Sequence, residues 1–417
     1  MSEYYKIEEI CKVKGGKRIP QGCTLQETPN KHPYIRILDM YQGRIINISR
    51  EMQYAKEEYW NIIKSYTVKK GDVILAIVGN TLGMVSVIGD TLDGANLTEN
   101  CCKFNDLDTN KVRKLFLYYS LIAPLNQKKI EKFKVGSSQP KLPIYNINQL
   151  LVPKWSVEVQ EKIVSILSAI DSKIENNNRI NQELESMANT IYDYWFLQFE
   201  FPNKDGKPYK SSGGKMVWNE ELKREIPEGW KVGNLYDIAE FINGLACQKY
   251  RPINQDRKIP VIKIKEMHEG ISDNTEFVRE DIPEKNIVND GDILFSWSAT
   301  LETMIWTGGK GGLNQHIFKI IPKEYAKYYV YMQLSAYIIN FVHMAEARKT
   351  TMGHITTDHL KQSRIALPTK KITDMYDEKV QGIFNKMICN SRQNRELILL
   401  RDFLLPLLMN GQVGFKD

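Results

Sequence analysis

The sequence contains one series of segments twice, and this repetition constrains the fold more than any other feature. Matching segments of the two copies lie 215 to 227 residues apart, which leaves each copy long enough to form its own core. Three pairs of segments carry the repeat: 34–40 with 261–267, 68–75 with 288–295, and 150–153 with 365–368. We therefore expect two similar domains rather than one large domain.

A long helix is expected after the closing proline of each copy, because seam residues there step by fours and threes. The first seam reads Ile163, Leu167, Ile170, Ile174, Asn177, Asn181, Leu184, Ala188, Ile191 and Trp195. The second seam, 213 residues further along, reads Tyr376, Val380, Ile383, Met387, Asn390, Asn394, Leu397, Arg401, Leu404 and Leu408. The shared spacing predicts two long helices that pair as an antiparallel coiled coil.

Each seam carries two asparagines at the same two steps: Asn177 and Asn181 in the first, Asn390 and Asn394 in the second. An amide inside a seam costs stability but fixes the register of the helices. In antiparallel pairing the four amides can bond to one another, and slippage by one turn would cost about 1–3 kcal/mol for each unpaired group. The alternative is that the asparagines face solvent on two unrelated amphipathic helices.

The expected fold class is α+β: two similar α/β domains separated by two long helices that form an antiparallel coiled coil, as a pseudo-twofold internal repeat. Short β-branched runs predict strands at 69–77, 84–88, 292–296 and 315–321, and apolar faces predict helices over 111–133 and 324–347. Residues 202–214 are polar and rich in Pro and Gly, which is typical of a surface linker. The resulting plan is a first domain (1–157), a first helix (158–199), a linker (200–225), a second domain (226–369) and a second helix (370–417).

Charge is distributed unevenly along the chain, whose formal net charge is +7. Residues 1–157 contain 23 Lys/Arg and 15 Asp/Glu, whereas residues 158–199 contain 3 and 7. This contrast favours a polyanion partner for the domain and a protein partner for the helix. The longest apolar runs are too short to span a bilayer and the N-terminus lacks a signal-peptide core, so we expect a cytoplasmic protein that does not contact a membrane. The six cysteines form no CxxC pair, which favours free thiols over disulfides or zinc.

The sequence lacks the motifs of the common nucleotide-binding and DNA-modifying enzymes. Each Gly-Lys pair is followed by Arg, Pro, Met or Gly, whereas a phosphate-binding P-loop needs Ser or Thr there, and no GxGxxG occurs. His354 and His359 lack the intervening Glu of an HExxH metal site. In a chain with two similar domains, these absences favour a binding protein with no catalytic residues, no metal and no cofactor of its own.

The loops that follow the predicted strands carry side chains suited to DNA. Arg and Lys bind phosphates and guanine edges, and Asn and Gln can bond adenine at two points. The candidates in the first copy are Lys14, Lys17, Arg18, Asn80, Thr81, Ser137, Ser138, Gln139 and Lys141. The candidates in the second copy are Lys249, Tyr250, Arg251, Ser296, Trp297, Ser298, Asn314, Gln315, His316, Arg348, Lys349, Thr350 and Thr351. Similar loops at matching places in both copies favour a DNA-binding role over solvated loop decoration.

The layout resembles the specificity subunit of type I restriction–modification enzymes over essentially the whole chain. The resemblance is carried by GSSQPKL at 136–142, by the segments 151–153, 160–163 and 167–176, by 191–196 with 199–202, and by IPEGW at 226–230. The second helix departs from the family pattern at 371–375 and at Arg401.

The resemblance implies two target-recognition domains, each of which reads half of a split sequence in double-stranded DNA, with the paired helices as the spacer. It also implies that the chain directs two methyltransferase (modification) subunits, which carry S-adenosylmethionine and methylate adenine. Restriction subunits that use ATP and Mg²⁺ can join such a complex, which serves in phage defence.

Two other classes of function remain open on the residues alone. An enzyme with an unrecognised DNA-modifying site would be indicated by modification of DNA by the purified chain alone. A scaffold that uses its coiled coil only for protein partners would be indicated by a reconstituted complex without salt-sensitive DNA binding.

Overall fold

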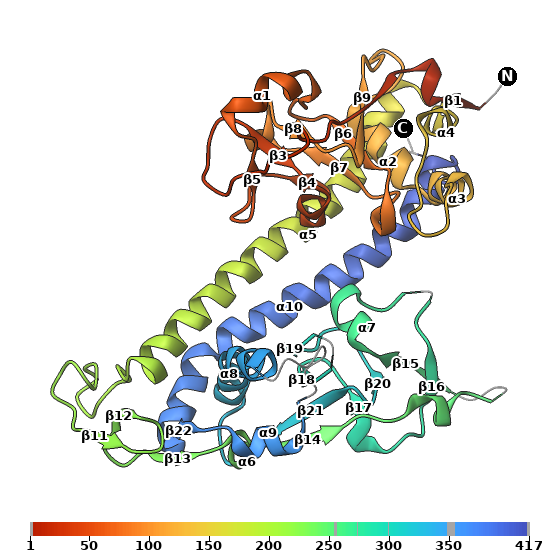
Figure 1. Ribbon diagram of the computed structural model, residues 1–417. Helices are drawn as coiled ribbons and strands as arrows, with labels where there is room; N and C mark the ends of the chain where they lie inside the picture. Colours follow the sequence, from red (N-terminus) through yellow and green to blue (C-terminus); the bar gives the residue numbers. More distant parts are fainter. Residues whose placement is uncertain (1–2, 254–256, 273, 299, 348–354, 415–417) are drawn as a thin grey trace. The chain divides into compact units, whose positions relative to one another are not determined.

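The computed structural model describes residues 3–253, 257–272, 274–298, 300–347 and 355–414. It divides into two compact units, Met1–Ile174 with Leu397–Asp417 and Glu175–Glu396 (Figure 1). The boundaries fall inside the two long helices, α5 (Val157–Tyr192) and α10 (Lys370–Met409). Each unit therefore contains one domain together with a part of both helices.

The first unit contains a mixed five-stranded sheet in the order β2-β9-β6-β7-β4 and a smaller sheet in the order β5-β3-β8. The strands are β2 (Lys12–Gly15), β9 (Cys101–Asn105), β6 (Val73–Ala76), β7 (Val85–Ile88), β4 (Ile45–Ile46), β5 (Gln53–Tyr54), β3 (Pro33–Ile35) and β8 (Asn96–Leu97). A separate pair, β1 (Tyr4–Lys6) with β10 (Leu151–Pro153), joins the two ends of the domain. The helices are α1 (Glu57–Ile63), α2 (Lys114–Ile122), α3 (Pro124–Phe133) and α4 (Ile144–Ile147). The core packs residues of α2 against the sheet and against Ile163 and Leu167 of α5.

The second unit repeats this plan. Its sheets have the orders β14-β21-β18-β19 and β16-β15-β20-β17, and β13 pairs with β22. The strands are β14 (Ala239–Asn243), β21 (Ile317–Pro322), β18 (Ile293–Ser296), β19 (Glu302–Ile305), β16 (Phe277–Arg279), β15 (Lys258–Ile262), β20 (Gly311–Leu313), β17 (Ile287–Val288), β13 (Lys231–Gly233) and β22 (Ile365–Leu367). The helices are α6 (Leu235–Ile238), α7 (Ile264–Glu269), α8 (Lys327–Ala347) and α9 (Thr357–Gln362). A hairpin of β11 (Met216–Asn219) and β12 (Arg224–Pro227) precedes them.

The internal repeat predicted from the sequence is confirmed strand by strand. In both units a central strand, β9 or β21, lies antiparallel between two others, β2 and β6 or β14 and β18. In both units a strand of the other sheet, β3 or β15, pairs in parallel with β8 or β20. The two copies therefore share one topology.

The prediction of one continuous helix over 111–133 is wrong. Residues 111–133 form two helices, because Pro124 disfavours the helical conformation at Ala123, whose φ and ψ are −61° and 145°. The helix predicted over 324–347 begins later, at Lys327.

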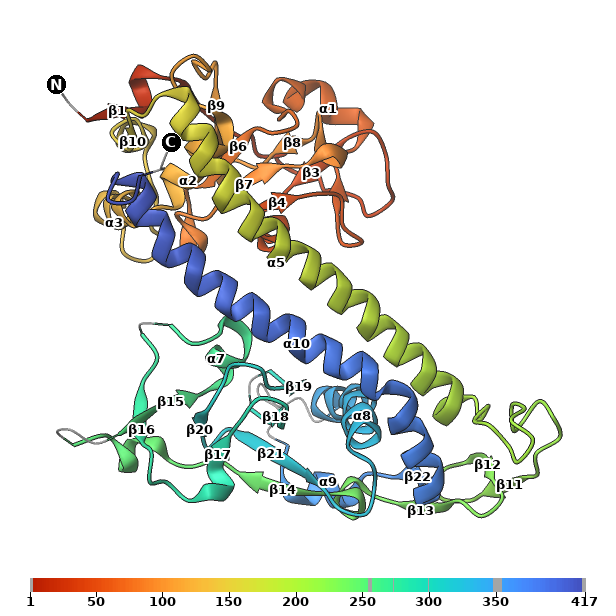
Figure 2. The same cartoon turned by 180° about the vertical axis from the view of Figure 1, so that it is seen from behind.

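The antiparallel pairing of the long helices is confirmed in the second unit, where their segments run side by side (Figure 2). Asn177 Nδ2 donates to Asn394 Oδ1 at 2.8 Å, and Asn390 Nδ2 donates to Asn181 Oδ1 at 2.9 Å. Asn177 and Asn390 are only 0% and 2% exposed, which rules out the solvent-facing alternative. The four amides form two hydrogen-bonded pairs across the helices, as antiparallel pairing predicts.

Candidate nucleic-acid interface

The candidate loops of the first domain leave one edge of its main sheet. Strands β2 and β6 both run antiparallel to β9, and both end against its first residues: Gly15 pairs with Cys102, and Ala76 pairs with Cys101. The loop that holds Lys17 and Arg18 and the loop that holds Asn80 and Thr81 must therefore start at the same edge (Figure 1). Strand order, which the sequence does not state, brings them together.

The loop at 137–141 joins the same edge through the backbone. The Gly79 N–H donates to Pro140 O at 2.8 Å, and Leu142 N–H donates to Ile77 O at 2.9 Å. The side chains of this loop point into solvent, and the exposed residues are Ser137, Ser138, Gln139 and Lys141. Asn80 is exposed and Thr81 is half-buried on the adjoining turn.

The basic residues at this edge differ in how firmly they are held. Lys14 and Lys17 lie over the ring of Tyr66, with Nζ 5.0 Å and 5.7 Å from its centroid, and the Lys14 ammonium also donates to Ser65 O. Arg18 is 82% exposed and lies 3.6 Å from a carboxylate oxygen of Glu99. All three side chains are exposed, so each can exchange its present contact for a phosphate.

A lysine beneath this edge is held by the fold. The ammonium of Lys103 on β9 donates to Thr67 O. Burial lowers the pKa of Lys103, and the charges of Lys14 and Lys69 lower it further, whereas Asp72 opposes the shift. This clustering of like charges makes the edge favourable for an anion.

The second domain presents the equivalent edge. Strands β14 and β18 end against the start of β21, where Asn243 pairs with Phe318 and Ser296 pairs with Ile317. The loop after β14 contains Lys249, Tyr250 and Arg251, of which Lys249 and Arg251 are exposed and Tyr250 is half-buried. Two of the three loops therefore start at equivalent places in both domains.

Close backbone approach at both edges requires glycine at one position in each copy. A Cβ on Gly16 would lie 2.0 Å from Thr98 O, and a Cβ on Gly244 would lie 2.0 Å from Asn314 O. No side chain fits at such a distance, so each glycine lets the first loop cross the start of the central strand.

Three candidates of the second domain are buried. Ser296 donates to Thr300 O and is 0% exposed, Asn314 accepts from the His316 N–H and is 6% exposed, and Ser298 is 9% exposed. Trp297, Gln315 and His316 are half-buried beside them, and the rings of Trp297 and His316 lie 5.6 Å apart. The remaining candidates, Arg348, Lys349, Thr350 and Thr351, lie outside the described residues.

The structure adds two residues that the sequence gave no reason to select. An open hollow of about 580 Å³ in the first unit is lined by Asn80 and Thr81 and also by Tyr41 and Arg44. Tyr41 is 63% exposed, and the Arg44 guanidinium donates to Ser172 Oγ of α5 at 3.1 Å. Tyr41 belongs to the short 3-10 helix Ile37–Gln42, and the sequence around it carried no signal that indicated this position.

Within the described residues, no group of three or more His, Cys, Asp or Glu side chains is placed to hold a metal ion. No helix in that part of the chain is both long and apolar enough to cross a bilayer.

Comparison with known proteins identifies the repeated unit. A family model described as the type I restriction modification DNA specificity domain matches residues 2–186 and 227–387. The specificity subunit of the type I restriction enzyme MjaIX from Methanocaldococcus jannaschii is 25% identical, over 99% of this chain and 93% of the relative. The HindI specificity subunit from Haemophilus influenzae is also 25% identical, over 83% of this chain and 87% of the relative. The crystal structure of a type I restriction–modification S subunit from M. genitalium shares the fold, with a TM-score of 0.54 and 14% identity over 99% of this chain and 96% of that one.

Proposed function

Because this chain belongs to the family of type I restriction–modification DNA specificity proteins, it is a DNA-recognition subunit without catalytic activity of its own, and we propose how it reads DNA. Residues 1–157 and 226–369 act as two target-recognition domains, and each reads one half of a bipartite target. The paired helices 158–199 and 370–417 hold the two domains, with 200–225 as the connection.

The observation that carries this proposal is the repeated sheet edge. In each copy the loops after the two strands that flank the central strand converge near its start, and a glycine allows the close approach. Two equivalent surfaces with basic and amide side chains suit two separate stretches of one polyanion.

The exposed and half-buried side chains divide into two roles. Lys17, Arg18 and Lys141 in the first domain, and Lys249 and Arg251 in the second, bind phosphates. Asn80, Gln139 and Gln315 carry the amides that can bond base edges. Buried Ser296, Ser298 and Asn314 support the loops of the second domain rather than contact DNA directly.

The partners follow from the family. Two methyltransferase subunits bind the chain and supply S-adenosylmethionine, and restriction subunits supply the chemistry that uses ATP and Mg²⁺. This chain itself carries no cofactor and works in the cytoplasm on double-stranded DNA.

The test is to map methylated adenines in the host genome with and without this chain. We expect one bipartite motif to disappear when the chain is deleted and to return with the wild-type chain. A second strain carrying Trp297→Ala and Gln315→Ala should change or lose specificity in one half of the motif only. Persistence of every motif after deletion, or simultaneous change of both halves, would contradict the proposal.

A further inference from the structure

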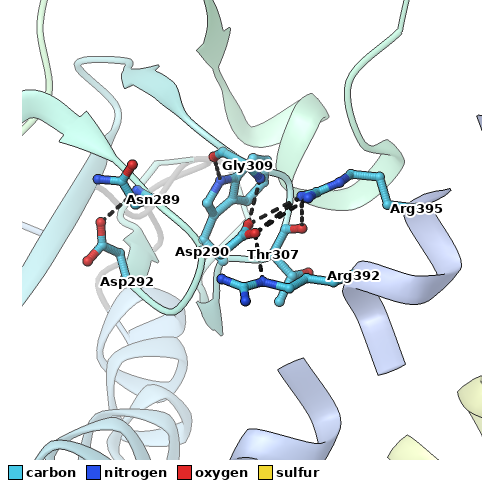
Figure 3. A network of polar contacts seen from close by, with 8 residues as sticks. Asn289, Asp290, Asp292, Thr307, Gly309, Arg392 and Arg395 are labelled. Carbon is cyan, nitrogen blue, oxygen red and sulfur yellow. Dashed lines mark hydrogen bonds and ion pairs between the residues drawn. The ribbon is translucent and has the colours of Figure 1, made fainter. Parts of the chain in front are cut away.

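An aspartate in a turn of the second domain contacts the helix α10 (Figure 3). Asp290 lies in the turn between β17 and β18, and its side chain is only 11% exposed. Its carboxylate accepts from Arg392 Nε at 2.8 Å and from Arg395 Nη1 at 3.3 Å, both on α10. It also accepts from the Gly309 N–H at 2.6 Å.

Neighbouring hydrogen bonds join the turn at 289–292 to the loop at 306–309. The Gly291 N–H donates to Trp306 O at 2.7 Å, the Trp306 N–H donates to Asp292 O at 2.8 Å, and the Trp306 indole donates to Gly309 O at 2.6 Å. The Arg395 guanidinium donates to Thr307 O as well, so α10 holds both loops at once. A shift at the Asp290 contact would therefore move both loops together.

The turn is coupled to the candidate DNA-binding edge by one short strand. Strand β18 begins at Ile293, directly after the turn, and ends at Ser296, next to Trp297. All four of its residues are buried, and the strand is about 13 Å long at 3.3 Å per residue. A rigid buried strand transmits a change of angle at its beginning to the loop at its end.

Two separate contacts are needed to fix an angle, and α10 supplies both. The aromatic contact of Phe384 with Tyr328 and Tyr331 is the first. Arg392 follows Phe384 by eight residues, or about 12 Å of helix. The Asp377 carboxylate of α10 accepts from the Tyr328 and Tyr329 N–H groups and belongs to this first contact, and the ionic contact adds a second one further along α10.

The first copy has residues of different charge at two of the three matching positions. Lys70 occupies the position of Asp290 in the matching turn, and it pairs with Asp90 at 2.8 Å. The residues of α5 that match Arg392 and Arg395 are Arg179 and Gln182. A lysine cannot pair with an arginine, so the contact belongs to the second copy alone.

The charge state of Asp290 favours a permanent contact at neutral pH. Burial by itself raises the pKa of this carboxyl, but the Gly309 N–H and the guanidiniums of Arg395 and Arg392 outweigh it and hold the pKa below its usual range. The carboxylate is therefore charged at neutral pH, where both arginines are charged as well.

We propose that Asp290 is a positioning residue that fixes the angle of the second domain on α10, and thereby the distance along DNA at which the second half-site is accepted. The inference rests on the proposed bipartite reading. On this inference, Asp290 sets how strictly the complex requires one gap length between the half-sites, whereas the loops read the bases.

The test uses the full chain assembled with its methyltransferase subunits, on a DNA library in which the two half-sites are constant and the gap varies by one or two base pairs. Wild type should methylate one gap in preference to the others. Asp290→Asn keeps the shape of the side chain and an acceptor for Gly309 but loses the charge. We expect the preference for the native gap over its neighbours to fall by about tenfold, with both half-site sequences unchanged.

Asp292→Asn is the matched control, because Asp292 lies in the same turn but pairs with Lys319 and the Asn289 N–H, not with α10. It should keep the wild-type preference. The double variant Arg392→Gln with Arg395→Gln approaches the contact from the helix and leaves the turn intact, so it decides the matter if Asp290→Asn does not fold. It should relax the gap in the same way.

Three results would overturn the inference: undiminished gap preference in both Asp290→Asn and the double arginine variant, a changed half-site sequence, or an equal loss in Asp292→Asn. Wild type that methylates every gap equally would instead refute the bipartite reading itself.

Discussion

The two domains meet the long helices with different chemistry at matching positions. In the first unit Asp171 of α5 is 4% exposed and accepts from Tyr119 Oη at 2.7 Å and from Arg401 Nη1 of α10 at 3.2 Å. In the second unit the matching residue of α10 is Phe384, which stacks on Tyr328 at 4.3 Å and meets Tyr331 edge-on at 5.5 Å. One junction is a polar triad and the other is an aromatic cluster.

The difference shows that the register of the helices does not depend on the chemistry of the junctions. Arg401 occupies a seam position where the first copy has Ala188, and its charge is matched by Asp171 and Asp402. The asparagine layer in the second unit supplies bonds that need one register. Once those bonds fix the register, the two junctions can diverge.

The aromatic junction should be the more sensitive to truncation. Phe384→Ala removes a ring that is 1% exposed and leaves a cavity between α8 and α10, so we expect a loss of about 3–5 kcal/mol in the stability of the second domain. Hydrogen exchange in denaturant, followed separately for each domain, measures it. Leu399→Ala, at a side chain that is 65% exposed, is the control and should change little. Loss of protection in the first domain rather than the second would contradict the expected role of Phe384 at the second junction.

Truncation at the polar junction should cost less stability, and the losses from changing Asp171 and Arg401 should depend on each other. Asp171→Ala leaves the Tyr119 hydroxyl and part of the Arg401 charge without a partner, and we expect a loss of about 2 kcal/mol in the first domain. The value is below that of a fully buried pair because Arg401 is 25% exposed and keeps Asp402. Adding Arg401→Ala should cost less than the sum of the two single changes. Strict additivity would mean that the triad is not a unit.

Acid should weaken the contact at Asp290, which only the second copy has. Because the folded-state pKa of Asp290 is lowered, its stabilising contribution is present above the unfolded value of about 3.9 and is lost as the pH falls through the folded value. The stability difference between wild type and Asp290→Asn should therefore be largest at pH 7 and shrink below about pH 4. Chemical denaturation at several pH values tests this, and a difference that grows on acidification would contradict it.

The smallest effect is expected at the DNA-binding edges, where the two copies should behave alike. On the proposed roles, Lys141→Ala and Lys249→Ala would each remove one phosphate contact, so the slope of log affinity against log salt should fall by about 0.9 in either case, on every DNA sequence. Lys154→Ala is the control, since Lys154 is exposed in the same domain but lies over the ring of Tyr5. Weaker binding to selected sequences only would assign these lysines to base reading.

Much of the architecture is determined by the sequence itself, because its signals are local and periodic. The repeat, the two seams and the asparagine layer follow from spacing along the chain, and all three are found in the structure. Pro124 also carried a signal for the break between α2 and α3, but the apolar face on both sides of it predicted one helix.

Tertiary structure alone decided which residues meet. The convergence of the candidate loops depends on the order of strands in a sheet, and the burial of Ser296 and Asn314 depends on what packs over them. Asp290 lies 102 residues before Arg392, and no periodicity links a turn to a helix so far along the chain. Spacing fixes contacts within a helix or between two helices in register, whereas contacts between a loop and a helix arise only when the domain has folded around its core.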